Sequence, residues 1–523
     1  MTQNTIEQTA TKRIAAIDLG TNSFHAVIVD IYPDGSFRTV DKLKEMVILA
    51  EKGMENHLSN DAIDRGLEAL NRIKSLCDRQ EVAEILAYAT SAIREADNGG
   101  DFIQRTQDEV GITVRAIPGK MEAEMIGLAV RHGIALGPEN VLMVDIGGGS
   151  VEFIVGNNDS FTYLKSLKLG VARMAARFVN SDPISKKDIK ALRKHYKTEL
   201  KEVAETLAKH SVKTIIGSSG TMENIAAMIA GRNDITAAMT LNELVYSAEE
   251  FNSFYGYFIK LDETERRKEK NLDEKRVPII NPGMVLADYL IKAFDIENIK
   301  ISEGALRDGM IINYINDNRA NTDLQLIADF PDPRKRSIHE LLRKCNWQAA
   351  HSQQVAKLAG QLFDTLREDF GLPEADRELL EYAALLHDIG YYISYRKHHK
   401  HALYIIRHSD LRGFTEDEIN LMAHVARYHR RSHPKKKHTE YKKLPKSLRK
   451  RIKKLSAILR VADGLDRSHY QNVRNMDIEI GKEQITLHLT TEGDPELEIW
   501  GACHKGKLLE KVTGKSLRVL RKA

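Results

Sequence analysis

Cysteine is scarce in this sequence of 523 residues: only Cys77, Cys345 and Cys503 are present, and no two lie close together. An odd, scattered set argues against a disulfide framework and against a structural zinc site. Long apolar runs are also missing, since none approaches the ~18 residues that a membrane span requires. The polar opening MTQNTIEQTATKR lacks the apolar core of a signal peptide. We therefore expect a cytoplasmic protein that does not contact a membrane.

The net charge of the chain is small, +4, but it is unevenly distributed. Fifteen Lys and Arg residues and one acid, Glu440, lie between Arg427 and Arg460, a stretch of charge +14 that we call the basic segment. The rest of the chain is therefore net acidic. Such a segment either binds a polyanion or forms a solvated, lysine-rich face, and charge alone does not decide between them. The length and the overall composition fit a soluble protein of three or four domains.

A short motif occurs twice along the chain. Residues 17–23, IDLGTNS, match residues 144–150, VDIGGGS, at an offset of 127 positions. Each copy joins two apolar runs and therefore predicts a strand, a glycine turn and a second strand. An acid, Asp18 or Asp145, stands at the end of the first strand in each copy. The sequence therefore predicts one duplicated supersecondary unit.

A third glycine turn lies in KTIIGSSGT, residues 213–221, after another predicted strand and before a helix expected from Met222. Strands alternate through this part of the chain with predicted helices, which argues for an α/β fold of two related halves. The helices are expected over residues 61–78, 121–132 and 186–209.

The glycine turns indicate a site for anions. Exposed backbone N–H groups in such turns form a concave nest, and the missing Cβ atoms let phosphate oxygens approach closely. No Gly-Lys-Ser/Thr follows, so the motif is not a P-loop. Asp145 and Glu152 flank the second turn, and Mg²⁺ prefers a few carboxylates together with waters and substrate phosphates. The alternative for Asp145 is a residue that stabilises the turn.

The pattern changes near residue 320. Residues 316–337 are polar and contain two prolines, and they read as a connector. Helical periodicity dominates beyond it, and alternation returns in MDIEIGKEQITLHLTT, where a small appendage with strands is expected. The predicted helices of this part are 338–369, 376–390, 416–428 and 447–465.

The duplicated hairpins and GSSGT resemble the phosphate and adenosine motifs of the actin, sugar-kinase and heat-shock ATPase superfamily. Within it, five stretches are closely similar to the exopolyphosphatase/guanosine pentaphosphate phosphohydrolase (Ppx/GppA) family: AAIDLGTNSFHAVIVD, ATSAIREA, IPGKMEAEMIGLAV, VDIGGGSVEF and ISEGALRDGM. The similarity covers roughly residues 13–315 in the order of the family. The helical C-terminal extension resembles the long members of that family.

The resemblance implies an α/β protein with duplicated actin-like (ribonuclease H-like) halves around a phosphate cleft. An all-α HD-like domain and a small α+β appendage follow. The expected domains are residues 1–134, with the first phosphate hairpin and the catalytic glutamate, residues 135–318, with the second hairpin, residues 319–474 and residues 475–523.

The family implies metal-dependent release of terminal phosphate. By motif, Glu122 becomes the catalytic carboxylate that orients or deprotonates water, although the helix dipole also favours an acid in a first helical turn. Arg94, in TSAIREA, matches an arginine that contacts phosphate and is otherwise a surface charge. The family usually has an acid before the catalytic glutamate, and Met121 stands there in this chain. The other residues assigned to phosphate binding are Asp18, Asn22, Ser23, Gly147, Gly148, Gly149, Ser150, Ser219, Gly220, Thr221 and Arg276.

A second resemblance lies in the helical part. The order of His351, the pair His387-Asp388 and Asp463 is similar to that of the HD phosphohydrolase superfamily. Imidazoles and carboxylates can share one divalent metal inside a helical bundle, where a bound water can attack phosphate. The alternative is a helical scaffold without metal. Neighbouring histidines could add ligands or contact phosphate, and they are His398, His399, His401, His424 and His429.

The leading hypothesis is an exopolyphosphatase that uses Mg²⁺ or another divalent cation, with a second divalent metal in the helical domain. A phosphohydrolase of guanosine pentaphosphate or tetraphosphate, or of another nucleotide, is the alternative. The basic segment favours a long polyanion, because a small nucleotide cannot contact so many cations. A nucleotide-binding switch and an RNA-binding protein are less favoured, since the chain has a full catalytic set and no recognisable RNA module. We also expect a homodimer without a nucleic-acid partner.

Overall fold

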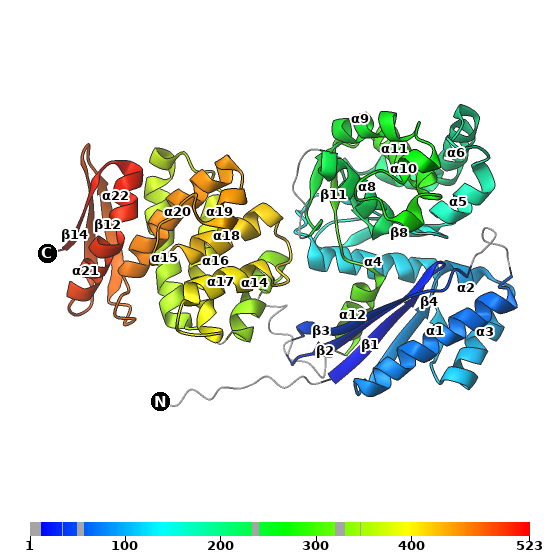
Figure 1. Cartoon of the computed structure of the whole chain (residues 1–523), viewed down its shortest axis with the longest axis horizontal. Helices are drawn as coiled ribbons and strands as arrows, with labels where there is room; N and C mark the ends of the chain where they lie inside the picture. The colour runs from blue at the N-terminus through cyan, green and yellow to red at the C-terminus, as the bar shows by residue number, and fades with distance from the viewer. Residues whose placement is uncertain are drawn as a thin grey trace. The chain divides into compact units, whose positions relative to one another are not determined.

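The computed structural model describes residues 12–33, 35–49, 57–232, 240–318, 330–345 and 347–522 (Figure 1). The described residues form two compact units, one within Ile6–Pro333 and one within Arg334–Ala523. Half of the predicted connector, residues 319–329, lies outside the described residues. A search of the described helices finds none with the length and apolar character needed to cross a membrane.

The first unit contains two sheets built on the same plan. In each sheet a hairpin is extended by a third antiparallel strand, and the first strand of the hairpin also pairs with a parallel strand on its other side. The strand orders are β3-β2-β1-β4-β5 and β10-β11-β9-β6-β7-β8. The first sheet consists of β1 (Lys12–Leu19), β2 (Ser23–Ile31), β3 (Phe37–Met46), β4 (Glu84–Ala89) and β5 (Val114–Ala116). The second consists of β6 (Val141–Ile146), β7 (Val151–Gly156), β8 (Phe161–Leu167), β9 (Thr214–Ser218), β10 (Val245–Ser247) and β11 (Asn298–Ile301).

The two glycine hairpins have the same turn. The Gly20 N–H donates to the Ser23 carbonyl over 3.2 Å, and the Gly147 N–H donates to the Ser150 carbonyl over 3.1 Å. These pairs of residues are 127 positions apart, as in the sequence repeat. The predicted duplication and the predicted actin-like α/β fold are therefore confirmed.

Helices cover both sheets and also join them. The helices of the first unit are α1 (Asn60–Arg79), α2 (Ser91–Glu95), α3 (Gly99–Arg105), α4 (Gly119–Gly133), α5 (Val171–Phe178), α6 (Lys186–Glu199), α7 (Lys201–Leu207), α8 (Ser219–Arg232), α9 (Ala248–Phe258), α10 (Glu263–Arg266), α11 (Ile280–Ala293) and α12 (Leu306–Asp317). A π-turn, η1 (Thr106–Val110), and a 3-10 turn, η2 (Glu274–Arg276), complete it. The predicted 186–209 helix is two helices, α6 and α7, which meet at Leu200.

A core between the two sheets holds the halves together. Buried side chains of both sheets, of α4 and of α12 form one cluster, and Figure 1 shows α4 running between the sheets. α12 follows the second sheet in the chain but packs against α4 and β1. A Cβ atom on Gly309 would lie 1.9 Å from the Met125 carbonyl oxygen, so glycine permits this close approach of α12 to α4. The last helix of the unit therefore returns to the first half.

The second unit is a helical bundle with a small sheet. Its helices are α14 (Pro333–Lys344), α15 (Ala349–Phe370), α16 (Asp376–Leu386), α17 (His398–Arg407), α18 (Glu416–Arg427), α19 (Thr439–Lys443), α20 (Lys446–Gly464), α21 (Glu496–Lys505) and α22 (Lys507–Thr513), with the 3-10 turn η4 (Ile389–Tyr392). The predicted helix 338–369 is α14 and α15, and the predicted helix 376–390 ends at Leu386. The predicted helices 416–428 and 447–465 correspond to α18 and α20.

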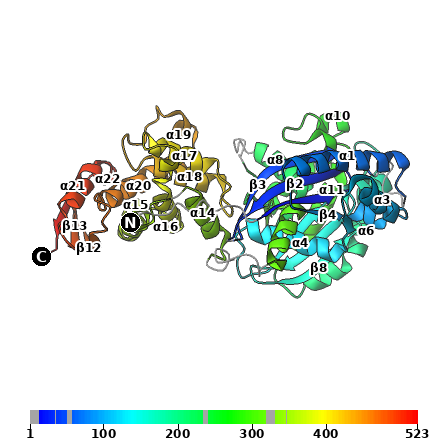
Figure 2. The ribbon, with the colours of Figure 1, turned by 90° about the horizontal axis from the view of Figure 1, so that it is seen from below.

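The predicted appendage is a three-stranded sheet in the order β12-β13-β14. Its strands are β12 (Val473–Ile480), β13 (Gln484–Thr491) and β14 (Ser516–Arg521). β13 and β14 are parallel, so they need a crossover, which α21 and α22 provide while packing against β14 (Figure 2). Buried residues of the sheet belong to the same hydrophobic cluster as the helical bundle. The appendage therefore shares the core of the helices.

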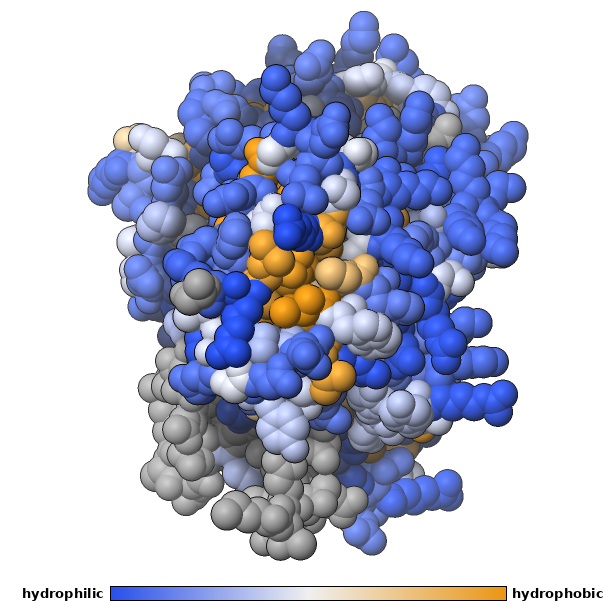
Figure 3. Space-filling view, turned by 90° about the vertical axis from the view of Figure 1, so that its left-hand side faces the viewer, coloured by the Kyte–Doolittle hydropathy of each residue, from blue (hydrophilic) through white to orange (hydrophobic). Residues whose placement is uncertain are grey.

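The surface drawn in Figure 3 is largely hydrophilic, with one apolar patch among charged side chains. Several large apolar or aromatic side chains of the second unit are nevertheless exposed, including Tyr395 at 75% and Trp500 at 56%. Both of these line the pocket described below.

Candidate functional sites

The second glycine hairpin is held in place by α5. The backbone N–H groups of residues 170–172 donate to the carbonyls of Gly147, Gly148 and Gly149 over 2.9–3.3 Å. A trans peptide points its C=O and its N–H in opposite directions. The N–H groups of residues 148–150 are therefore directed away from α5. Adjacent N–H groups that point the same way form an anion-binding nest.

The first hairpin is arranged similarly. The carbonyls of Thr21 and Asn22 accept hydrogen bonds of 2.9–3.1 Å from the N–H groups of residues 47–49. The N–H groups of Asn22 and Ser23 consequently point the other way. The tips of the two hairpins adjoin, because a Cβ atom on Gly148 would lie 3.1 Å from Asn22 Nδ2. The structure thus brings together the hairpin residues that the sequence assigned to phosphate.

The third glycine turn is anchored to the end of β6. The hydroxyls of Ser219 and Thr221 donate to the Ile146 carbonyl over 2.9 and 2.8 Å. This anchorage starts α8 at Ser219, three residues before the predicted start. Arg276 donates to Thr221 Oγ1 over 2.9 Å, and a Cβ atom on Gly220 would lie 2.1 Å from its guanidinium. The turn therefore positions Arg276, and the hydroxyls of Ser219 and Thr221 are hydrogen-bonded to the backbone.

Glu122 lies in the first turn of α4 and is only 5% exposed. Arg94, on α2, donates from Nη1 to Glu122 Oε2 over 2.8 Å and to the Ile117 carbonyl over 2.8 Å. Burial raises the pKa of Glu122 to about 7, with Arg94 opposing the shift and the carboxylates of Asp18 and Asp145 adding to it. A carboxylate with such a pKa can accept a proton near neutral pH.

Asp145 and Glu152 face each other across the second hairpin. Ser218 donates to Asp145 Oδ2 over 2.9 Å, and Ser166 donates to Glu152 Oε1 over 2.7 Å. Burial raises the pKa of both carboxyls, and for Glu152, whose pKa lies well above its ordinary value, the nearby carboxylates of Glu122 and Asp145 add to the effect of burial. At the equivalent position of the first hairpin, His25 faces Asp18, so the duplicated site is chemically asymmetric.

Two further cations, Arg307 and Lys44, belong to this site, and the sequence analysis did not assign them. Burial and neighbouring cations lower the pKa of His25 to about 3. Those cations are Arg307, Lys44 and Arg276. Arg307 Nη1 lies 3.8 Å from Asp18 Oδ2. Arg307 lies within the motif ISEGALRDGM, so the sequence could have identified it as a site residue. Lys44 lies in the polar strand β3, where no motif marks it as one.

The acids of this site fit Mg²⁺ bound mainly by substrate and water. Asp18 Oδ1 is buried without a hydrogen-bond partner, and burial raises the pKa of Asp18 to about 6. Within the described part of the chain, no three acids here bring ligand atoms within 4.8 Å of one another. Mg²⁺ typically takes one or two carboxylates and completes its shell with waters and phosphates. The predicted ligands Asp145 and Glu152, with Asp18 beside them, are consistent with that chemistry.

The four residues predicted to hold a second metal converge in the helical unit. His351 lies on α15, His387 and Asp388 follow α16, and Asp463 lies on α20. The distance from Asp388 Oδ2 is 3.9 Å to His351 Nε2 and 3.5 Å to His387 Nε2. Asp463 Oδ1 lies 3.8 Å from His351 Nε2. This buried His and Asp cluster could hold a metal ion.

The histidines of the cluster have fixed tautomers. The Nδ1 atoms of His387 and His429 each lie 2.6 Å from a helix carbonyl, and Nδ1 of His351 lies 2.8 Å from Asp466 Oδ2. An Nδ1–H that donates in this way leaves Nε2 as the ligand atom, which is the usual support of a metal-bound imidazole. The Nε2 atoms of His351 and His387 are buried and make no hydrogen bond. The donor set therefore fits a divalent metal.

Of the five additional histidines, the structure places two at the cluster. Asp388 Oδ1 lies 3.1 Å from His398 Nε2 and 3.6 Å from His429 Nε2. His401 instead contacts the Arg396 carbonyl. Burial lowers the pKa of His399 to about 4 and the pKa of His424 to about 3. The sequence analysis missed Asp466, which orients His351, and Lys505, which forms an ion pair with Asp463.

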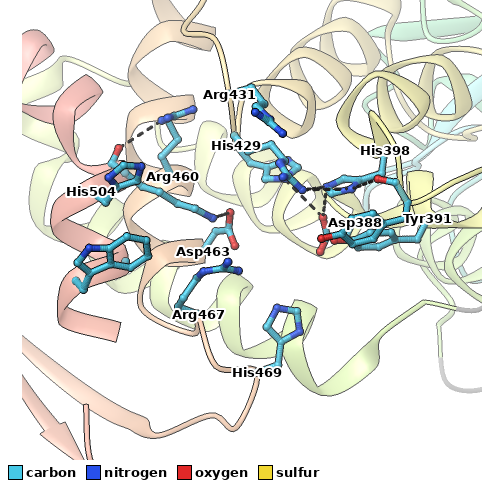
Figure 4. A pocket seen from close by; sticks show the side chains of 15 residues that line it. Asp388, Tyr391, His398, His429, Arg431, Arg460, Asp463, Arg467, His469 and His504 are labelled. Atoms are coloured by element: carbon cyan, nitrogen blue, oxygen red, sulfur yellow. Dashed lines mark hydrogen bonds and ion pairs between the residues drawn. The ribbon is translucent and has the colours of Figure 1, made fainter. Parts of the chain in front are cut away.

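A pocket of about 340 Å³ adjoins this cluster (Figure 4). Asp388, His398 and His429 lie together in one part of it, and Asp463 lies in another. Three arginines of the basic segment line the pocket, while Lys435, Lys436 and Lys437 are exposed. The basic segment is therefore partly a solvated face and partly a pocket wall. The three arginines are Arg430, Arg431 and Arg460.

Comparison with known proteins shows similarity along both units. A model of the Ppx/GppA phosphatase family matches residues 27–317, and a model of Ppx/GppA phosphatase domain III matches residues 334–497. An exopolyphosphatase from Cytophaga hutchinsonii is 28% identical, with 58% of this chain and 98% of that chain covered and a TM-score of 0.56. A Ppx/GppA family member from Aquifex aeolicus is 27% identical, with 59% and 99% covered and a TM-score of 0.51.

Proposed function

Because the chain belongs to the Ppx/GppA phosphatase family, whose members are hydrolases, we propose that its first unit is an exopolyphosphatase. The reaction removes the terminal phosphate of inorganic polyphosphate by attack of water. One observation carries the proposal: Glu122 lies at a place where two hairpin nests, Arg94 and the Asp18–Arg307 pair meet. Phosphoryl transfer requires a base for the attacking water, hydrogen-bond donors for the phosphate oxygens, and cations that offset the negative charge.

The residues of the chain would act as follows. The N–H groups of the two hairpins hold the terminal phosphates, and Arg94, Arg276 and Arg307 offset their negative charge. The oxygen of water forms a bond to the terminal phosphorus while the bridging P–O bond breaks, and Glu122 takes the proton released. Mg²⁺, when held by Asp145 and Glu152 with substrate phosphates, supplies positive charge that stabilises the transition state.

Polyphosphate is the preferred substrate in this proposal, and guanosine pentaphosphate is the alternative. Both carry a terminal phosphoanhydride, so the first unit could cleave either. Two observations favour polyphosphate. The basic segment suits a long polyanion, and the similar protein from Cytophaga hutchinsonii is described as an exopolyphosphatase.

The proposal is tested by phosphate release from long polyphosphate, short polyphosphate, guanosine pentaphosphate and ATP in parallel, with Mg²⁺. We expect Glu122→Gln to lower kcat on polyphosphate by at least ~100-fold through loss of general-base assistance, with substrate binding retained. Glu124→Gln, at an exposed position of the same helix, is the matched control and should keep wild-type turnover. Near-normal turnover of Glu122→Gln would remove Glu122 from the mechanism.

A further inference from the structure

The pocket beside the His and Asp cluster has no part in the reaction proposed for the first unit. Its volume of about 340 Å³ falls within the range of small-molecule sites, which is about 300–1,000 Å³. The metal-ligating candidates Asp388, His398, His429 and Asp463 line part of it. The remaining walls carry cations and aromatic rings. These three kinds of side chain decide what the pocket can bind.

The cations of the pocket are not all used within the protein. Lys505 is paired with Asp463, and Arg460 donates to the Tyr428 carbonyl over 3.0 Å. Among the described residues, no carboxylate pairs with Arg431 or Arg467, although both line the pocket (Figure 4). Arg431 also has a φ of 59°, an unfavourable backbone conformation for arginine. Unpaired guanidinium groups beside a candidate metal site match the charge and geometry of a phosphate group.

The aromatic rings select among phosphate compounds. Trp500 lines the pocket with 56% of its surface exposed and is stacked on His504, with ring centroids 5.1 Å apart and planes at 11°. Tyr395, 75% exposed, lines the pocket as well. Inorganic phosphate and polyphosphate offer no flat apolar face to such rings, whereas a nucleobase does. Trp500 and Lys505 follow the part of the chain that the domain III model matches.

We propose that the second unit binds a mononucleotide in this pocket and hydrolyses its phosphate ester, independently of the first unit. The phosphate lies among Arg431, Arg467 and the His and Asp cluster, and the base stacks on Trp500. The oxygen of water forms a bond to phosphorus, the ester P–O bond breaks, and the nucleoside oxygen takes up a proton. The products are a nucleoside and inorganic phosphate. A divalent metal, which His351, His387 and Asp388 would hold, would supply positive charge that offsets the charge of the phosphate.

Base stacking is tested with tryptophan fluorescence of the full-length protein. The chain has two tryptophans, and Trp347→Phe removes the other one, which packs against the core. We expect AMP and GMP to quench the remaining Trp500 emission saturably, and sodium phosphate and tripolyphosphate to leave it nearly unchanged. In calorimetric titrations, Trp500→Ala should weaken AMP binding about tenfold, in the range of base–aromatic stacking, without affecting phosphate binding. Trp500→Phe, which keeps an aromatic ring, should restore most of the affinity.

Hydrolysis and metal binding are tested on the same chain. His387→Ala/Asp388→Ala should remove about one equivalent of divalent metal per chain, measured by elemental analysis, and abolish phosphate release from AMP and GMP. Glu122→Gln should keep the bound metal and the release of phosphate from AMP and GMP, while it loses polyphosphate cleavage. These opposite patterns separate a failure of this proposal from a failure of the proposal for the first unit.

Three outcomes would overturn the inference. Equal affinity for AMP and inorganic phosphate, unchanged in Trp500→Ala, would show a phosphate site without base recognition. Binding of nucleotide without phosphate release from metal-loaded protein would overturn the catalytic assignment. Loss of AMP hydrolysis in Glu122→Gln, with circular dichroism unchanged, would place the activity in the first unit.

Discussion

At the scale of single residues, the first site gathers carboxylates that oppose one another. Glu122 and Glu152 are buried, with Asp145 and Asp18 beside them, and burial raises the pKa of each carboxyl. Arg94 partly compensates the charge of Glu122. A site of this kind destabilises the folded protein when its carboxylates are ionised and is stabilised by cations and their phosphate ligands.

This charge cluster predicts a pH dependence of stability. The pKa of Glu122 is about 7 in the folded protein, against an ordinary value of 4.5, so the native state holds a proton that the unfolded state has released. Stability is therefore lost as the pH rises from about 4.5 through 7. Glu122→Gln lacks this titration, and in metal-free buffer we expect it to be about 2–3 kcal/mol more stable than wild type at pH 8 and nearly equal at pH 4.5.

Urea unfolding at several pH values measures this difference. Glu124→Gln, the exposed control, should follow the wild type at every pH. A stability difference between Glu122→Gln and wild type that does not change with pH would show that Glu122 does not retain its proton in the folded protein.

At the scale of elements, the hairpins are the part that the sequence determines best. Their acids, glycines and apolar flanks lie within single stretches of about twenty residues, so strand, turn and site residues could be read locally. The residues that escaped prediction are those that the fold brings from elsewhere. Arg307 arrives on α12, which crosses back to α4, and Lys505 arrives on α21, far beyond the last recognised motif.

The junction between the second hairpin and α5 provides a test at this scale. A Cβ atom on Gly170 would lie 2.4 Å from the backbone of Gly148 and Gly149, so Gly170→Ala must displace the hairpin. We expect a loss of stability of about 1–3 kcal/mol, typical of overpacking, and a lower kcat/KM for polyphosphate. Gly256→Ala in α9 is the control, since a Cβ atom there meets nothing within 4 Å and alanine favours the helix. Wild-type kinetics and stability in Gly170→Ala would mean that α5 does not hold the hairpin in place.

At the scale of the whole molecule, the described residues form two compact units. Each hydrophobic cluster of the described residues lies entirely within one unit. The change of periodicity near residue 320 led us to expect a new domain there, and the chain divides between Pro333 and Arg334. The sequence also predicted the four metal-ligating candidates of the second unit, because each stands in a short motif, but it did not predict the pocket. The pocket depends on α15 to α21 packing together, which no local pattern encodes.

The basic segment provides a test of polyphosphate as the proposed substrate. Under the proposed function, long polyphosphate would contact many cations of the basic segment, and each neutralised phosphate releases counterions. We therefore expect neutralisation of five exposed lysines to weaken binding of long polyphosphate and to flatten the salt dependence of that binding. Cleavage of guanosine pentaphosphate should hardly change. The lysines to be replaced by glutamine are Lys435, Lys436, Lys437, Lys442 and Lys443.

Binding is measured as a function of salt concentration for polyphosphates of several lengths. Equal losses on long and short substrates would mean that the replacements disturbed the fold or the active site. No loss on either would make these lysines a solvated face and would favour the nucleotide alternative for the first unit.

The position of α21 in the chain has a consequence for how the protein is made. The first unit is complete once α12 has been synthesised, whereas Trp500 and Lys505 follow almost 190 residues later. At ordinary rates of translation this interval lasts roughly 10–40 s, and N-terminal domains fold first during synthesis. A nascent or prematurely terminated chain can therefore carry a finished first site and an open, unfinished second pocket. Translation itself separates the two sites in time.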